Sequence, residues 1–298
     1  MPLFCEQCSA DLKSDAKFCE ECGVQLREKV PTNVSSPKRT LLLVGLSFIT
    51  AIGIVVILFF ITGLLSLTGQ KGPGALLARL YKSPEDARRE LGQLGVSYNE
   101  TAFLESAKNG DALAVELFLA AGMNPNAIDE NGIPALIWAA MKGHTEIVRA
   151  ILAHPGINVD VKAGNGWTSL MYAAWEGHPD TVQVLLENGA DVNVQVKGGW
   201  TALMYAASKG HTDTVRSLLA RGADVNAGNE SGATALIWAA YGGHTAIVQV
   251  LLDKGAAVNI KDNTGRAALK YAADYGYTDI VRALLNKGAS VNTKDNTS

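Results

Sequence analysis

Four cysteines, the only ones in the chain, lie within its first 22 residues as two similar pairs. The pairs occur in Phe4-Cys5-Glu6-Gln7-Cys8 and Phe18-Cys19-Glu20-Glu21-Cys22. Each pair offers two thiolates, and two pairs complete the tetrahedral ligand set that zinc prefers. A segment of about 25 residues cannot build an adequate apolar core, so the metal would supply its folding free energy. We therefore predict a structural zinc site formed by Cys5, Cys8, Cys19 and Cys22.

This segment, residues 1–28, resembles the small zinc-ribbon found at the N-terminus of many bacterial membrane proteins. Iron in place of zinc stays open, because four thiolates suit both metals. A redox CxxC motif is the rival reading, but no strand–helix pattern surrounds the pairs. A disulfide framework is a further alternative.

A second feature is the uncharged stretch from Thr40 to Gln70, whose central part, 41–67, is dominated by Leu, Ile, Val and Phe. About 20 helical residues cross the hydrocarbon core of a bilayer, so 41–67 is predicted to be a transmembrane helix that contacts lipid. A buried helix of a globular core is the alternative, although such a helix normally keeps a polar face. A Pro/Ser-containing linker, 29–40, precedes the stretch.

The basic residues nearest the predicted span are Lys38 and Arg39, on its N-terminal side. The positive-inside rule then favours a cytoplasmic N-terminus and an exported C-terminal region. Free thiols would also stay reduced on the cytoplasmic side. We expect a single-pass protein of a bacterial inner membrane. Residues 68–97 are predicted to be a linker with a short helix, capped by Ser83, starting at Pro84 and stopping at Gly95.

The remaining region, 98–298, is periodic. One glycine recurs at steps of 33, 34, 33, 33 and 33, at Gly110, Gly143, Gly177, Gly210, Gly243 and Gly276. Within the third unit we expect Thr168 to cap a first helix that ends at Gly177, followed by a second helix from Pro179 to Glu187. A single helix pair cannot cover its own apolar surface, so we predict a stack of about six pairs.

The segments Gly-Trp-Thr-Ala-Leu-Met-Tyr-Ala-Ala (199–207), Gly-His-Thr (210–212) and Gly-Ala-Asp-Val-Asn (222–226) resemble ankyrin repeats. The predicted fold is mainly α: an ankyrin-repeat solenoid plus the zinc-ribbon and one transmembrane helix. The repeats would span about 98–128, 129–161, 162–195, 196–228, 229–261 and 262–293. The first and sixth units are the most divergent, with polar Glu105, Lys270 and Asp274, and we expect them to act as caps.

The resemblance implies a groove made by loop tips and first helices, where protein partners bind. Mapped onto this sequence, the candidate partner-binding residues are Ile133, Met141, Trp167, Trp175, Trp200, Tyr241 and Arg266. Exposed Trp and Tyr suit an interface hot spot. Packing between repeats is the alternative for the tip tryptophans, and it is the preferred reading for Trp138, Tyr172, Tyr205, Trp238 and Tyr271. Four histidines recur at one repeat position, which indicates a structural role.

Residues 98–298 hold 15 Lys/Arg against 20 Asp/Glu, a net charge of −5, so no nucleic-acid partner is expected. No nucleophile elbow, Walker loop or HExxH motif is present, so we expect neither enzymatic activity nor a small-molecule substrate. The predicted function is a membrane-anchored adaptor that binds another protein. The alternatives are a transmembrane sensor or regulator that relays partner binding to the zinc unit, and an enzyme with an unrecognised site.

Overall fold

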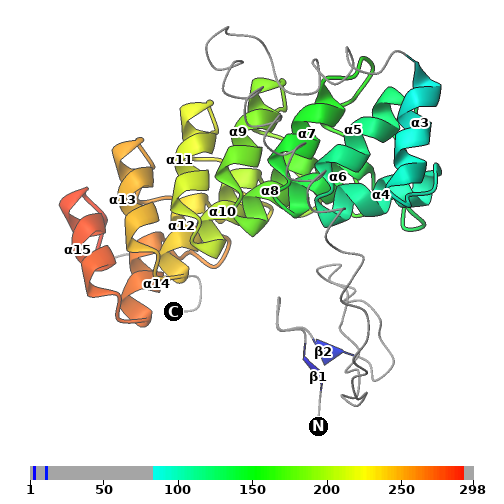
Figure 1. Cartoon of the computed structure of the whole chain (residues 1–298). Helices are drawn as coiled ribbons and strands as arrows, with labels where there is room; N and C mark the ends of the chain where they lie inside the picture. Colours follow the sequence, from blue (N-terminus) through cyan, green and yellow to red (C-terminus); the bar gives the residue numbers. More distant parts are fainter. Residues whose placement is uncertain (1–2, 5–10, 13–82, 292–298) are drawn as a thin grey trace, which may run out of the picture. The chain divides into compact units, whose positions relative to one another are not determined.

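The computed structural model describes residues 3–4, 11–12 and 83–291 (Figure 1). The chain divides into two compact units, Met1–Lys71 and Gly72–Ser298. In the first unit, β1 (Leu3–Phe4) pairs antiparallel with β2 (Asp11–Leu12), with Leu3 opposite Leu12. The four cysteines, the linker 29–40 and the predicted span 41–67 lie outside the described residues. None of the helices in the described part combines the length and the apolar character that a bilayer crossing requires.

The second unit contains six consecutive helix pairs that form two layers (Figure 1). The first helices of the pairs are α4 (Glu100–Asn109), α6 (Ala135–Met141), α8 (Ser169–Glu176), α10 (Ala202–Lys209), α12 (Ala235–Tyr241) and α14 (Ala268–Asp274). The second helices are α5 (Ala112–Ala120), α7 (Thr145–Leu152), α9 (Pro179–Glu187), α11 (Thr212–Ala220), α13 (Thr245–Asp253) and α15 (Thr278–Asn286). Each helix packs on its counterpart in the neighbouring pair, as the helical periodicity predicts.

Three of the first helices, α8, α10 and α12, begin at threonine caps, and the inner first helices pack through small residues. The Thr168 hydroxyl accepts a hydrogen bond from the Met171 N–H at 3.3 Å, which confirms the predicted cap. Thr201 and Thr234 repeat this arrangement one and two units later. The alanine pairs of the inner units are fully buried, which lets adjacent first helices approach closely: Ala139/Ala140, Ala173/Ala174, Ala206/Ala207 and Ala239/Ala240.

The recurring histidines connect each unit to the one before it. The Nε2–H of His211 donates to the Trp175 carbonyl oxygen at 2.9 Å, and that of His178 donates to the Met141 carbonyl at 3.1 Å. His144 and His244 make the same bond to the preceding unit. These bonds satisfy carbonyl groups near the C-termini of first helices, which otherwise lack partners. In the sixth unit, Tyr277 occupies the histidine position.

The turn asparagines also connect units. The regular spacing of Asn193, Asn226 and Asn259 suggests bonds to local backbone, but this expectation is wrong. Each side-chain oxygen accepts an N–H from the following unit, at 2.8–2.9 Å, from Asp224, Ala257 and Ser290 respectively. A side chain in an exposed turn reaches the next turn because the stacked units place equivalent turns side by side.

The short helix before the repeats is α3 (Pro84–Gln93), with Ser83 as its N-cap and Gly95 at φ +74° after its end. We expected it inside a linker, but it packs on α5 as the second helix of an incomplete unit. Its Ala87 and Leu91 are fully buried. The Arg88 guanidinium and the Tyr98 hydroxyl both donate to the Ala121 carbonyl, at 3.2 and 3.0 Å. α3 therefore covers the outer layer at the N-terminal end.

Candidate functional site

Aromatic side chains form a continuous series of ring contacts along one side of the stack, from the third unit to the sixth. We call this series the aromatic strip; it comprises Trp167, Tyr172, Trp175, Trp200, Tyr205, Trp238, Tyr241, Tyr271 and Tyr275. Its members come from loop tips and first helices. They extend over four consecutive units, which gives a partner a long surface to contact.

The tip tryptophans are positioned by tight turns. The Trp167 N–H donates to the Asn165 side-chain oxygen at 3.0 Å, and its carbonyl accepts from the Ala163 N–H at 2.9 Å. Gly166, directly before it, has φ +84°, a conformation that a β-carbon would disfavour. These bonds fix the backbone at Trp167, so the turn determines the direction in which its side chain leaves the backbone.

Both tip tryptophans contact an aromatic ring across a boundary between units, in a tilted arrangement. The ring centroid of Trp167 lies 4.2 Å from that of Tyr205, and the centroid of Trp200 lies 4.6 Å from that of Trp238. Both indoles are nevertheless only half-buried. Packing between repeats therefore accounts for part of each ring, while another part faces solvent. The same half-buried state holds for Trp175.

The C-terminal part of the strip is more exposed. The side chains of Tyr241 and Tyr275 are 45% and 52% exposed, and their rings meet edge to face with centroids 5.3 Å apart. Tyr275 is absent from the sequence-based site. It stands directly before the repeated glycine, in a position otherwise occupied by Asn109, Lys142, Glu176, Lys209 and Gly242. Variation at one position of an otherwise regular repeat is the signal that could have identified it.

Two lysines cover aromatic faces. The Lys209 ammonium nitrogen lies 3.7 Å from the centroid of Trp175, and that of Lys108 lies 4.7 Å from Trp138. Such cation–π contacts contribute about 0.5–1 kcal/mol at exposed sites. Neither lysine was among the predicted site residues. One face of the Trp138 ring and one face of the Trp175 ring are therefore each in contact with a cation of the same chain.

Burial raises the pKa of two phenols in the strip, Tyr205 and Tyr172. Desolvation, followed by the neighbouring Tyr172 hydroxyl, raises the pKa of Tyr205 above its ordinary value. Desolvation likewise raises the pKa of Tyr172, partly opposed by the hydrogen bond from Asn165. Both phenols are therefore neutral at physiological pH.

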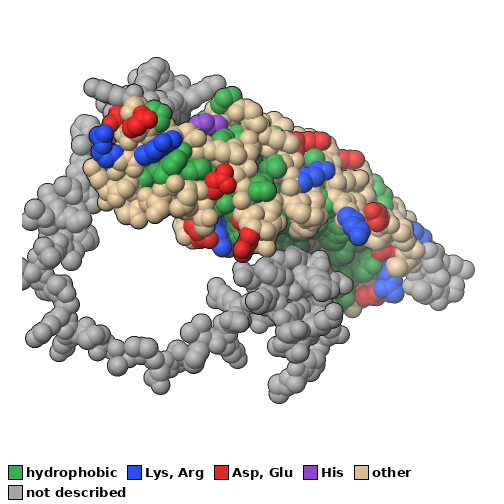
Figure 2. All heavy atoms as spheres, turned by 90° about the vertical axis from the view of Figure 1, so that its right-hand side faces the viewer, with side chains coloured by type: hydrophobic (Ala, Val, Ile, Leu, Met, Phe, Trp, Pro, Cys, Tyr) green, Lys and Arg blue, Asp and Glu red, His purple; other side chains and the backbone are tan. Residues whose placement is uncertain are grey.

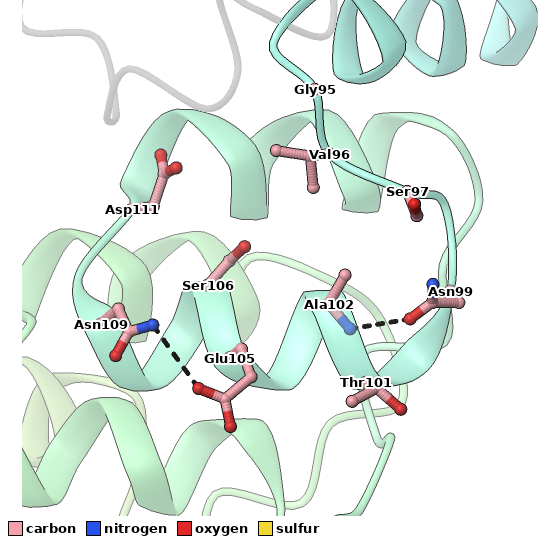
Figure 3. A pocket seen from close by; sticks show the side chains of 10 residues that line it. All are labelled: Gly95, Val96, Ser97, Asn99, Thr101, Ala102, Glu105, Ser106, Asn109 and Asp111. Carbon is pink, nitrogen blue, oxygen red and sulfur yellow. Dashed lines mark hydrogen bonds between the residues drawn. The ribbon is translucent and has the colours of Figure 1, made fainter.

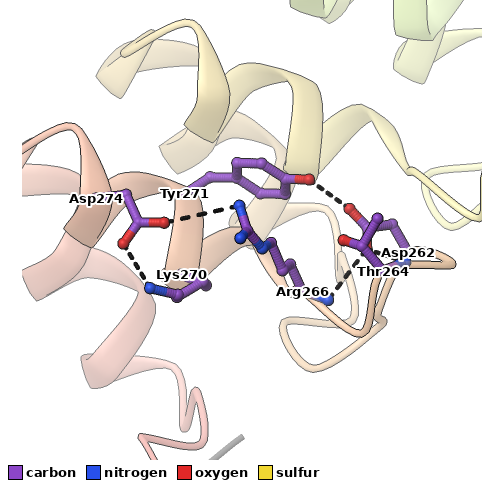
Figure 4. Close-up of polar contacts among 6 residues, drawn as sticks. All are labelled: Asp262, Thr264, Arg266, Lys270, Tyr271 and Asp274. Carbon is purple, nitrogen blue, oxygen red and sulfur yellow. Dashed lines mark hydrogen bonds and ion pairs between the residues drawn. The ribbon is translucent and has the colours of Figure 1, made fainter. Parts of the chain in front are cut away.

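The last tip residue belongs to a small polar cluster (Figure 4). Arg266 lies 3.9 Å from Asp274, which also pairs with Lys270 at 2.6 Å. The Tyr271 hydroxyl donates to Asp262 at 2.5 Å. Burial alone would raise the pKa of Asp262, but hydrogen bonds from Thr264, Tyr271 and the backbone hold it below its ordinary value. Arg266 thus borders the strip, with its guanidinium 6.0 Å from the Tyr271 ring.

The predicted site residues are only partly brought together. Ring contacts connect Trp167, Trp175, Trp200 and Tyr241 through the strip. Ile133 and Met141, in the second unit, are half-buried and take part in none of these ring contacts.

The described part of the chain was also searched for a metal site and for a basic surface that could bind nucleic acid. Within it, no group of three or more His, Cys, Asp or Glu side chains could hold a metal ion. Acidic and basic side chains are interspersed on the side of the stack nearest α3, without a basic stripe (Figure 2). Because Cys5, Cys8, Cys19 and Cys22 lie outside the described residues, the zinc site stays a prediction.

Comparison with known proteins points to one family. A family model described as "Ankyrin repeats (3 copies)" matches residues 103–196, 194–229 and 203–295, which together span about two thirds of the chain. The chain is also similar to "Ankyrin repeat protein nuc-2" of Neurospora crassa, at 29% identity over 85 residues. That match covers 26% of this chain and 8% of the relative, so the chain spans less than a tenth of the relative's length.

Proposed function

The chain belongs to the ankyrin-repeat family, and on that premise we propose that it is a membrane-anchored adaptor that binds another protein through its aromatic strip. Stacked repeats provide extended surfaces for protein partners. The observation that carries the proposal is the contiguity of rings across four units, all of them half-buried or exposed except Tyr205, which is 6% exposed. The proposal assigns no catalytic step to the chain.

The chemistry of the strip supports a protein interface. Trp and Tyr are enriched among interface residues whose truncation costs 2 kcal/mol or more. A ring already fixed by neighbouring rings loses little conformational entropy when a partner covers it. Trp167 and Trp200 meet this condition, because Tyr205 contacts both of them, at 4.2 and 4.8 Å between centroids.

The anchoring part of the proposal rests on the sequence. Residues 41–67 would cross the bilayer, and Cys5, Cys8, Cys19 and Cys22 would bind zinc on the cytoplasmic side, with the repeats exported across a bacterial inner membrane. The adaptor would then hold its partner at the membrane surface. Reporter fusions before Met1 and after Ser298 test this orientation. Activity of a cytoplasm-specific reporter at the C-terminal position would contradict it.

The partner-binding test compares full-length protein with the Trp167→Ala/Trp200→Ala variant in affinity capture from cells. A matched control, Gln183→Ala/Gln249→Ala, removes two exposed side chains of α9 and α13, each bonded only to an acid four residues on. We expect the strip variant to lose the proteins that the native and control forms enrich reproducibly. Because truncating Trp200 also removes packing, Tyr241→Ala serves as a milder third variant. Unchanged capture by all variants would remove the strip assignment.

A further inference from the structure

The aromatic strip carries hydrogen-bond donors that the described part of the chain leaves unused. Among the described residues, the indole N–H groups of Trp167, Trp175 and Trp200 donate to no acceptor, and they are not buried, unlike the indole N–H of Trp238. An indole has a donor but no acceptor atom. The strip therefore presents flat apolar faces together with donors that a ligand can satisfy.

Comparable groups at the N-terminal end of the stack already have partners. The indole N–H of Trp138 donates to the Asp129 carboxylate at 3.0 Å. A hollow of about 630 Å³ lies beside α4, where Asn109 donates to Glu105 at 3.5 Å, and no aromatic ring lines it (Figure 3). The strip, and not this hollow, therefore combines rings with unused donors.

Charge and backbone chemistry narrow the ligand that the strip can take. The Lys209 ammonium nitrogen already lies 3.7 Å from the centroid of Trp175, and the Arg266 guanidinium lies 6.0 Å from that of Tyr271, so a cationic ligand would meet like charges. An acidic ligand would meet the net charge of −5 on residues 98–298. An α-helical peptide could cover the rings, but its backbone carbonyls are bonded within the helix and would leave the indole N–H groups unpaired. The remaining ligand is neutral, apolar and rich in free carbonyl oxygens.

A proline-rich segment meets these requirements. Proline has no N–H, and the polyproline II helix has no internal hydrogen bonds, so its carbonyl oxygens are free to accept. Such segments dock in grooves lined by aromatic side chains. The helix repeats every three residues, which is about 9 Å.

The step between adjacent units of the stack is similar. Helices that pack on one another lie about 8–10 Å apart. The centroids of Trp167 and Trp200 are no more than about 9 Å apart, because the ring of Tyr205 lies 4.2 Å from the first and 4.8 Å from the second. One turn of a polyproline II ligand therefore spans the distance from one tip tryptophan to the next.

We propose that the segment recognised by the aromatic strip is a proline-rich peptide in the polyproline II conformation. The peptide lies across Trp167 and Trp200, which the ring of Tyr205 holds in place. Its pyrrolidine rings pack on the indoles, and its carbonyl oxygens accept hydrogen bonds from the indole N–H groups. This inference rests on the proposed adaptor function and narrows the class of partner.

The test is fluorescence anisotropy of a labelled proline decamer, about 31 Å long, titrated with the full-length protein in one detergent. We expect saturable binding of this peptide and none of a labelled Gly-Ser decamer. Trp167→Phe and Trp200→Phe each keep a ring but remove the N–H, so each should weaken binding about two- to tenfold.

The matched control is Trp138→Phe, because the N–H that it removes is already bonded to Asp129. Thr101→Ala, in the hollow beside α4, is a milder control. Both control variants should bind the proline decamer like the native form. Circular dichroism verifies that each variant keeps its helical signal.

The proposal is overturned if the native protein leaves the proline decamer unbound, or binds the Gly-Ser decamer equally well. It is also overturned if both strip variants bind like the native form, because the N–H groups then play no part. Binding of a labelled chitin hexamer in place of the proline decamer would assign the strip to glycans.

Failure of this inference is distinguishable from failure of the adaptor function. If only the inference fails, Trp167→Ala/Trp200→Ala still loses the proteins that the native form captures from cells. If the adaptor function fails, that variant captures the same proteins as the native form.

Discussion

The imidazole of His211 lies so close over Gly177 that a methyl group built on that glycine would come within 2.4 Å of the ring Nδ1. The same ring bonds the Trp175 carbonyl through Nε2. Glycine is therefore required at this position for two reasons: its φ of +79°, and the space that the histidine of the next unit occupies.

We expect Gly177→Ala to destabilise the stack more than Gly189→Ala. Gly189 has a similar φ of +86°, but a methyl group there would meet nothing within 4 Å. The strained backbone costs about 1–2 kcal/mol in either variant. Displacing the imidazole adds about 1–3 kcal/mol in Gly177→Ala alone. Urea unfolding followed by circular dichroism measures both, and equal midpoints would show that the histidine yields without cost.

A second prediction concerns Trp238, whose buried indole N–H finds no acceptor among the described residues. In the second unit the equivalent Trp138 donates to the Asp129 carboxylate at 3.0 Å, nine residues earlier. Asn229 stands nine residues before Trp238, and its one side-chain oxygen already accepts from Ser231 and Ala233. Asn229→Asp should therefore stabilise the protein by about 1–2 kcal/mol.

The reverse change, Asp129→Asn, is the control for this reasoning. It should destabilise the second unit by a similar amount. One oxygen of Asp129 accepts backbone N–H groups from Asn131 and Ile133, so the amide nitrogen would replace the other oxygen, which accepts from the Trp138 indole. Differential scanning calorimetry of the two variants decides the matter. A loss of stability in Asn229→Asp would mean that the added charge outweighs the new hydrogen bond.

A third prediction follows from Glu116 on α5. Burial, and then the neighbouring Glu146, raise the pKa of Glu116 to about 7. A carboxyl whose folded pKa exceeds its unfolded value contributes its full stability below the unfolded pKa and loses it as pH rises towards 7. Glu116→Gln removes this dependence, so its unfolding midpoint should exceed that of the native protein at pH 8 and differ little at pH 5.

Glu146→Gln removes the smaller of the two causes of the raised Glu116 pKa, the charge of Glu146. It should lower the pKa of Glu116 towards its ordinary value and give a weaker gain at pH 8 than Glu116→Gln. Urea midpoints measured from pH 5 to pH 8 provide the test. Parallel pH profiles for the native protein and Glu116→Gln would exclude this carboxyl as the source of the dependence.

A fourth prediction addresses the cysteines. Purified full-length protein should contain about one zinc ion per chain, as tetrahedral four-thiolate sites do. Cys19→Ser should abolish the bound metal, while Ser14→Ala, between the two pairs, should retain it. Elemental mass spectrometry distinguishes zinc from iron. Metal retained by Cys19→Ser would contradict the four-cysteine site.

The repetitive features of the fold were predictable because they depend on short-range physics. The Thr168 cap, the end of the helix at Gly177 and the bounds of α9 all follow from residues within one unit. The start of α3 at Pro84 was equally predictable, from the Ser83 cap and the proline that follows it. These signals are local, so one sequence sufficed to locate the helices.

Contacts between units were harder to foresee. The spacing of Asn193 does not say whether its side-chain amide bonds its own turn or the next one; the amide oxygen accepts from Asp224 in the next unit. The packing of α3 on α5 was missed because α3 lacks the repeat motif. The candidate site was seen in part: tryptophans at the tips stood out, whereas Lys209 and Tyr275 belong to a position that varies from unit to unit.

The bonds that join neighbouring units carry a consequence for how such a gene can change. The His–carbonyl bonds span the four boundaries from the first unit to the fifth, and the Asn–amide bonds span the three from the third unit to the sixth. Excising the fourth unit, a module of 33 residues, would rejoin like with like, and the new boundary between the third and fifth units would keep both bonds. Recombination could therefore lengthen or shorten the array, and with it the reach of the aromatic strip, without any compensating substitution.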